Sequence, residues 1–220
     1  MTHPTSSSAA KLQVVEFTSP WKPLGERSPN KQHKKEAVLL AATRMFNEKG
    51  FHATSLDEIA MVLNVTKPTV YYYFKSKDDI LYESVLLGLQ LIREGINRVK
   101  MRGGRAFDQL QACMDVYANI VMEDYGRCVV SVGENPLPES QRREIRQIKS
   151  EVDLVIRHLI EDCVEEGSIR KCNSKMAGFL LAGGLGSIAR WYAEGGELSS
   201  EEVSVIIRDY LLNGLVSNNL

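Results

Sequence analysis

Residues 55–77 read SLDEIAMVLNVTKPTVYYYFKSK, and this stretch carries the strongest structural signal in the 220-residue chain. It contains two short helical patterns separated by a turn at Asn64. The first opens with Ser55 and has a glutamate three residues later, which is the capping box that starts many helices. The second opens with Thr66 as the expected N-cap, and Pro68 fits its first turn, where no amide donor is needed. This spacing predicts a helix-turn-helix.

The second of these helices has a surface suited to DNA. The four consecutive aromatic residues at 71–74 cannot all face the core, because each step along a helix turns by about 100°. Lysines neutralise phosphates, while Thr and Tyr groups donate hydrogen bonds or lie against thymine methyls. The expected exposed side carries Lys67, Thr69, Tyr72 and Tyr73, with Lys75 and Lys77 just beyond. DNA binding is therefore the favoured hypothesis, and the alternative is a plain helical hairpin with an aromatic core.

The rest of the chain is also helical in pattern. Upstream, apolar residues recur at three- and four-residue spacing from Val38 to Phe46, and Gly50 follows as a C-cap. Downstream, a long helix opens at Ser76. Further helices are predicted at about 107–125, 139–166, 174–194 and 199–215, with a looser piece at 126–138. Because no alternating strand pattern appears, we expect an all-α fold.

The expected organisation has three parts. Residues 1–30 hold four of the seven prolines and a serine run, which predicts a flexible extension. Residues 31–80 would form the helix-turn-helix domain and residues 81–220 a helical domain for ligand binding and dimerisation. Charge follows this division, since residues 1–80 carry a net +3 and residues 81–220 a net −4. A basic N-terminal part on an acidic body favours a polyanion partner.

Composition narrows the function classes. The 44% hydrophobic and 25% charged fractions are those of a globular protein. No apolar run approaches the roughly 20 residues of a membrane span, and no secretory signal is present, so we expect a cytoplasmic protein without a membrane partner. The four cysteines form no C-x-x-C pair, which favours reduced thiols. The four histidines have no nucleophile or metal partner at useful spacing, so we expect no catalytic site, metal or cofactor.

Residues 34–82 resemble the DNA-binding domain of the TetR (tetracycline repressor) family. The motifs are Gly50-Phe51, Thr54-Ser55-Leu56, Val65 to Phe74 and Lys75-Ser76-Lys77. The resemblance implies a homodimer that reads a palindromic double-stranded DNA operator, with a C-terminal domain whose small-molecule ligand lowers operator affinity. The DNA contacts it implies are Thr54, Ser55, Lys67, Pro68, Thr69, Tyr71, Tyr72, Tyr73 and Lys77.

The predicted helix at 174–194 contains Gly183, Gly184 and Gly186, each of which costs roughly 1 kcal/mol relative to alanine. A close helix contact must compensate, and the last helix carries an apolar stripe that could supply it. Pairing of these two helices with their symmetry mates would make a four-helix interface, as the family resemblance also implies. The expected interface residues are Gly183, Gly184, Ser187, Trp191, Val203, Ile206, Ile207, Tyr210 and Leu211.

A ligand pocket is expected between the helix that opens at Ser76, the 107–125 helix and the 139–166 helix. Its candidate lining residues are Leu86, Leu89, Met114, Tyr117, Val121, Met122 and Cys128. These side chains are apolar and flexible, which favours a hydrophobic effector, although ordinary core packing would explain each of them. Nearby arginines could meet the anionic head of an acyl-CoA-like effector. They are Arg127, Arg142, Arg143 and Arg146.

Two rival hypotheses come from other classes. The run Gly184-x-Gly186-x-x-Ala189, with Asp209 about 20 residues on, matches a dinucleotide-binding fingerprint. That motif needs a strand before it, and the surrounding pattern is helical, so the match is weak. The other rival is a helical interaction module without DNA, which would show no salt-dependent retention on DNA.

Overall fold

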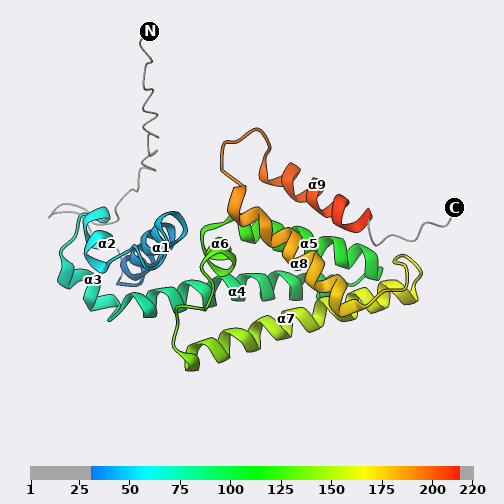
Figure 1. Ribbon diagram of the computed structural model, residues 1–220, viewed down its shortest axis with the longest axis horizontal. Helices are drawn as coiled ribbons and strands as arrows, with labels where there is room; N and C mark the ends of the chain where they lie inside the picture. The colour runs from blue at the N-terminus through cyan, green and yellow to red at the C-terminus, as the bar shows by residue number, and fades with distance from the viewer. Residues whose placement is uncertain (1–30, 214–220) are drawn as a thin grey trace, which may run out of the picture.

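The structure is a computed structural model that describes residues 31–213 (Figure 1), so the predicted N-terminal extension lies outside the described residues. The described chain holds nine α-helices and no strand, which confirms the all-α prediction. They are α1 (Lys31–Lys49), α2 (Leu56–Val62), α3 (Lys67–Tyr73), α4 (Lys77–Arg102), α5 (Ala106–Met122), α6 (Asp124–Ser131), α7 (Glu139–Glu165), α8 (Ser174–Trp191) and α9 (Ser200–Asn213). None of these helices is long and apolar enough to cross a membrane.

Helices α1–α3 gather at one end of the molecule, and α4 runs from them along its length (Figure 1). Both predicted capping boxes are present. The Ser55 hydroxyl accepts from the Glu58 amide at the start of α2, and Ser76 and Asp79 repeat the arrangement at the start of α4. Thr66 is the N-cap of α3 but makes no capping bond, because its hydroxyl pairs with that of Thr69 at 2.9 Å.

The segment predicted to be loose contains α6, so that prediction was wrong. The preceding helix, α5, ends at Met122, and the chain turns at Glu123 before α6 begins. Gly88 of α4 allows this close crossing, because a Cβ there would lie only 2.5 Å from the Tyr125 carbonyl oxygen. The short α6 packs against both α1 and α4.

Buried side chains form two clusters in the described chain. One joins α1–α3 and the first half of α4 with α6 and the start of α7. The other joins the second half of α4 with α5, α7, α8 and α9. Because α4 and α6 lie between the two clusters, any movement in the second can be transmitted to α1–α3 through these helices.

Candidate DNA-binding surface and ligand cavity

Helix α3 turns one face to the core and the other to solvent. Val70 and Phe74 are buried, whereas Tyr71 and Tyr72 are 44% and 66% exposed. Tyr73 is half-buried and packs against the core, contrary to its predicted exposure. It follows Val70 by three residues, so the two side chains share the buried face of the helix. The exposed aromatic surface is therefore Tyr71 and Tyr72.

Two lysines flank this aromatic surface. The Lys31 ammonium, at the first residue of α1, lies 4.9 Å from the centre of the Tyr72 ring. The Lys67 ammonium lies 5.8 Å from the Tyr71 ring and 2.8 Å from the Asp57 carboxylate of α2. Its hydrogen bond to Asp57 raises the pKa of Lys67 above its usual value. Pro68 is exposed and Thr69 is half-buried beside them.

Lys31 is a candidate DNA contact that the sequence reasoning missed. Its basic run at 31–35 was visible in the sequence, but nothing there indicated that α1 begins beside the recognition helix α3.

Thr54 has a different place from the predicted one. Its side chain is buried, and its hydroxyl donates to the Gly50 carbonyl oxygen at 2.9 Å, closing the end of α1. The hydroxyl is thus used within the protein and does not reach the surface for a phosphate. Ser55, the next residue, is exposed, although its hydroxyl also serves the α2 cap.

Lys77 is also held by the protein. Its ammonium donates to the carbonyl oxygens of Phe51 and Thr54 at 3.0 and 3.2 Å, with a third, longer contact to His52 at 3.4 Å. It also lies 4.5 Å from the centre of the Phe51 ring. An ammonium has three N–H donors, and all three are used here. The predicted phosphate contact through this ammonium therefore conflicts with its role in tying α4 to the α1–α2 connection.

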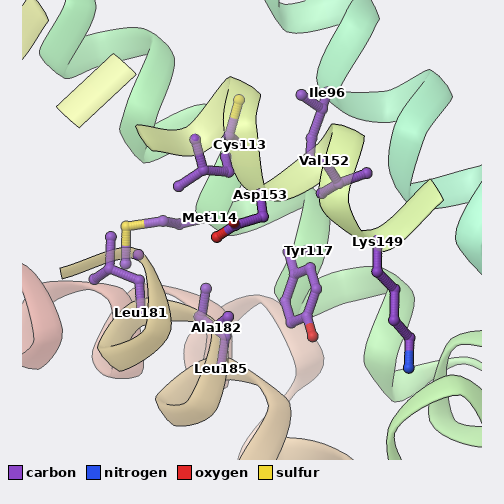
Figure 2. Close-up of a pocket in the computed structure, with 12 residues that line it drawn as sticks. Ile96, Cys113, Met114, Tyr117, Lys149, Val152, Asp153, Leu181, Ala182 and Leu185 are labelled. Carbon is purple, nitrogen blue, oxygen red and sulfur yellow. The ribbon is translucent and has the colours of Figure 1, made fainter. Parts of the chain in front are cut away.

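A cavity of about 120 Å³ lies in the other half of the molecule, among α5, α7 and α8 (Figure 2). Its lining residues are Ile96, Cys113, Met114, Tyr117, Lys149, Val152, Asp153, Ile156, Gly178, Leu181, Ala182 and Leu185. Most of this wall is aliphatic. Polar groups come from Tyr117 on α5 and from Lys149 and Asp153 on α7, and Figure 2 shows Tyr117 between Lys149 and the α8 residues. The cavity thus has the composition of a site for a mainly apolar molecule.

Of the seven predicted pocket residues, Met114 and Tyr117 line this cavity. The other five do not. Leu89, Val121 and Cys128 are buried in the core, Leu86 is packed against it, and Met122 lines a separate polar groove. The cavity still touches the three helices named in the prediction, because Ile96 lies on α4, and α8 adds a further wall. The residues differ because α6 packs on the part of α4 that holds Leu86 and Leu89.

An ion pair stands at the wall of the cavity. The Lys149 ammonium contacts the Glu134 carboxylate at 2.5 Å, and the Arg146 guanidinium lies 3.8 Å from the same carboxylate. Burial acts to raise the pKa of Glu134, but the hydrogen bond and charge of Lys149 outweigh it, and the pKa lies below its usual value. Arg142 and Arg143 pair with Glu139 instead. Glu134 therefore stays ionised at neutral pH and neutralises Lys149.

Helices α8 and α9 pack on each other within one chain. A Cβ at Gly184 would lie 2.7 Å from the Leu211 side chain of α9, whereas one at Gly183 would meet nothing within 4 Å. Val203 is buried against the core. The close approach predicted for Gly184 therefore occurs inside the protomer. Val203 faces inward because it lies in the first turn of α9, which packs on α5.

An apolar face of α8 and α9 stays exposed. Its residues are Met176, Phe179, Leu180, Trp191 and Tyr210, each more than half exposed. Ser187 is half-buried beside it, as are Ile206, Ile207 and Leu211.

The comparisons with known families agree with this geometry. The family model described as "Tetracyclin repressor-like, C-terminal domain" matches residues 103–215, half of the chain. The model described as "Bacterial regulatory proteins, tetR family" matches residues 38–83, which include α2 and α3. The chain belongs to the TetR family. It is therefore a DNA-binding transcriptional regulator with an N-terminal helix-turn-helix and a C-terminal domain of the TetR type.

The chain is also similar to individual regulators and to a solved structure. The HTH-type transcriptional regulator YhgD of Bacillus subtilis is 24% identical over 196 residues, 84% of this chain and 98% of YhgD. The negative regulator IcaR of the Staphylococcus aureus biofilm operon is 28% identical over 102 residues, 46% of this chain and 55% of IcaR. A solved structure of AibR with isovaleryl coenzyme A and operator DNA has a TM-score of 0.72 at 23% identity, covering 83% of this chain and 97% of AibR.

The structure also tests the rival hypothesis of a dinucleotide-binding fingerprint. Gly184, Gly186 and Ala189 all lie inside α8, and the described chain has no strand to precede them. A dinucleotide fingerprint needs its glycines at a turn between a strand and a helix. The dinucleotide reading is therefore wrong for this segment.

Proposed function

We propose that this TetR-family protein is a repressor that binds a palindromic operator as a homodimer and leaves it when a small hydrophobic or acyl-type effector fills the cavity. The observation that carries the DNA-binding part is the exposed Tyr72 of α3, flanked by Lys31 and Lys67. A tyrosine ring and hydroxyl between two ammonium groups can contact base edges and phosphates at the same time.

The chemistry of this surface suits a DNA groove. The lysines would neutralise phosphates on either side of α3, and the Tyr72 ring and hydroxyl would reach base edges. The pair between Lys67 and Asp57 is exposed and contributes little stability, so Lys67 can leave it for a phosphate. We infer that Pro68, Thr69 and Tyr71 extend the same contact.

The effector class follows from the size and lining of the cavity. A dry cavity of about 150 Å³ in another protein holds a benzene ring, so 120 Å³ accommodates roughly six carbon atoms. AibR was solved with isovaleryl coenzyme A, whose acyl group is of this size. We therefore infer a short aliphatic or acyl effector that enters between α7 and α8. IcaR is a negative regulator, which supports the assignment as a repressor.

The exposed face of α8 and α9 supports the homodimer. Phe179, Leu180 and Trp191 are all about half exposed on α8, and Gly183 leaves room for a close helix contact between them. An apolar face of this extent needs a cover, and a second copy of the same face provides one by twofold symmetry. Each dimer would then present two α3 helices to two half-sites about 34 Å apart, or a multiple of one DNA turn.

Three further parts of the proposal follow from this function. We infer that the protein is a regulator rather than an enzyme, because its relatives are transcriptional regulators. We place it in the bacterial cytoplasm, where the operator lies. We also propose a DNA-binding domain at residues 31–80 and an effector-binding and dimerisation domain at 81–220.

Capture of genomic DNA fragments by the full-length protein tests the proposal. We expect recovery of a few fragments that share a palindrome, with an affinity that falls steeply as salt rises, because phosphate contacts release counterions. Sequence-independent retention, or none at low salt, would contradict operator binding and favour a helical interaction module. The genes beside the fragments would then indicate which effector to try.

A further inference from the structure

Tyr117 and Lys149 both line the cavity, but they differ in their hydrogen-bond partners. Tyr117 is half-buried, its hydroxyl has no hydrogen-bond partner within the described residues, and burial raises its pKa. Lys149 is paired with Glu134, which lies in the connection between α6 and α7. The Glu134 side chain is only 14% exposed. A ligand that needs a cation must therefore compete with a carboxylate of the protein itself.

We propose that the effector carries an anionic head that replaces Glu134 at the Lys149 ammonium while its apolar body fills the cavity beside Tyr117. This inference rests on the proposed effector-binding function and adds the chemical class of the effector and the contact that it breaks. The class is a short aliphatic carboxylate, or an acyl group carried by an anionic head.

The charges at the cavity wall favour an anionic head that displaces Glu134 over one that binds beside it. Glu134 already neutralises Lys149, and Asp153, one turn further along α7, is paired with Arg157. A carboxylate added at this wall would therefore meet two carboxylates whose cations are already paired, so it gains most by taking the place of one of them. Glu134 has a second cation within reach, since the Arg146 guanidinium lies 3.8 Å away. The displaced carboxylate can therefore turn to Arg146 without losing its compensation.

The displaced contact is linked to the DNA-binding end by a continuous path. Glu134 follows α6, which packs on α1. At the start of α6, the Asp124 carboxylate accepts from Arg44 of α1 at 2.9 Å, and its carbonyl oxygen accepts from Asn47 of α1 at 2.9 Å. Release of Glu134 would free the C-terminal end of α6 while its N-terminal end still holds α1. A small shift of α6 would thus move α1 relative to α4.

Hexanoate and hexanamide, which have six carbons each, provide the test because they differ in charge and little in shape. Their dissociation constants are measured by NMR titration of the full-length protein. The variants are Glu134→Gln, Lys149→Met and the control Glu151→Gln. The control also removes one negative charge, but from an exposed site on α7 that is paired with Arg93. Thermal unfolding of each variant verifies that it is folded.

We expect wild type and Glu151→Gln to prefer hexanoate by about threefold or more, the order of one partly exposed ion pair. Glu134→Gln should bind hexanoate more tightly than wild type and leave hexanamide unchanged. Lys149→Met should bind both equally. In hydrogen exchange, hexanoate should raise the rate in residues 132–138 of wild type, and Glu134→Gln should show the raised rate without ligand.

If Glu134→Gln binds hexanoate no more tightly than wild type does, the effector does not replace Glu134 at Lys149. A preference for hexanoate that survives Lys149→Met, or the absence of binding by both probes in every variant, would also overturn the proposal. These outcomes leave operator capture intact. Failure of capture would contradict the proposed function instead, so the two failures are distinguishable.

Discussion

At the scale of single residues, Thr54 and Lys77 occupy positions that the family resemblance assigns to phosphate contacts, yet the protein uses both side chains itself. Sequence alone could not show this. A motif gives the residue type at a position, whereas the partner depends on how α4 approaches the α1–α2 connection. Ser55 and Tyr72 are exposed as predicted, because their exposure follows from helix periodicity.

Replacing Lys77 by methionine should lower the free energy of unfolding. Hydrogen bonds to a charged group contribute about 1.5–3 kcal/mol each. Because methionine keeps the apolar part of the side chain, we expect a loss of roughly 1–3 kcal/mol. Chemical denaturation measures it, and Lys75→Met at an exposed neighbouring site is the matched control. Equal stability of Lys77→Met and the control would show that the three carbonyl contacts are unimportant.

The cysteines allow a second test at this scale. Burial raises the pKa of Cys113 and Cys163 to about 11 and that of Cys128 to about 12. At pH 8 these three are therefore protonated, and the thiolate is the reactive form. Cys172 is less buried. We expect iodoacetamide at pH 8 to modify Cys172 alone in the native protein, read by peptide mass spectrometry. Modification of Cys128 at a similar rate would contradict its burial.

At the scale of elements, the sequence predicted the long helices well and missed α6. Capping boxes and apolar periodicity mark α2, α4 and α7 locally. The eight-residue α6 is too short for a clear period, and it is bounded by a glycine and prolines that usually signal loops. Its stability comes from packing on α1 and α4, which is non-local. The cavity does lie among the three helices expected to hold the pocket, α4, α5 and α7, but part of its lining comes from α8, which the prediction left out.

Two neighbouring glycines of α8 lie in different surroundings, since Gly184 faces α9 and Gly183 faces open space. Gly184→Leu should destabilise the protomer by about 1–3 kcal/mol, because the new side chain meets Leu211 of α9. In the dissociated protomer, Gly183→Leu should leave stability unchanged or slightly raised, since its site is open. Thermal unfolding of the two variants at a protein concentration below the dimer dissociation constant gives the comparison. A Gly184→Leu protein as stable as Gly183→Leu would mean that α9 does not pack on α8 as described.

At the scale of the whole molecule, α4 and α6 join a DNA-binding end to an end that holds the cavity and an exposed apolar face. The two-part organisation was predictable because each part has its own sequence pattern. The link between them was not, because Asp124 and Arg44 are 80 residues apart in the chain, and the Glu134–Lys149 pair depends on how a loop folds back on α7.

The exposed face gives a prediction about assembly. Wild type should sediment at twice the 24.7 kDa chain mass, with α8 at the twofold axis. Gly183→Leu should keep the fold and weaken the dimer, because its side chain projects from the face on which a partner would lie. Analytical ultracentrifugation over a concentration series measures the dimer dissociation constant. A Gly183→Leu dimer as tight as wild type would place the interface elsewhere.

The most direct test of the account is the affinity of the full-length protein for its captured operator fragment when Tyr72 is replaced by alanine. Tyr72 is 66% exposed, so its loss should leave the unfolding temperature unchanged. Met101→Ala, at an 87% exposed site at the far end of α4, is the control. At matched salt we predict a loss of roughly 1–3 kcal/mol of binding free energy for Tyr72→Ala and none for Met101→Ala. Binding by Tyr72→Ala as tight as wild type would contradict the assignment of the α3 surface to operator recognition.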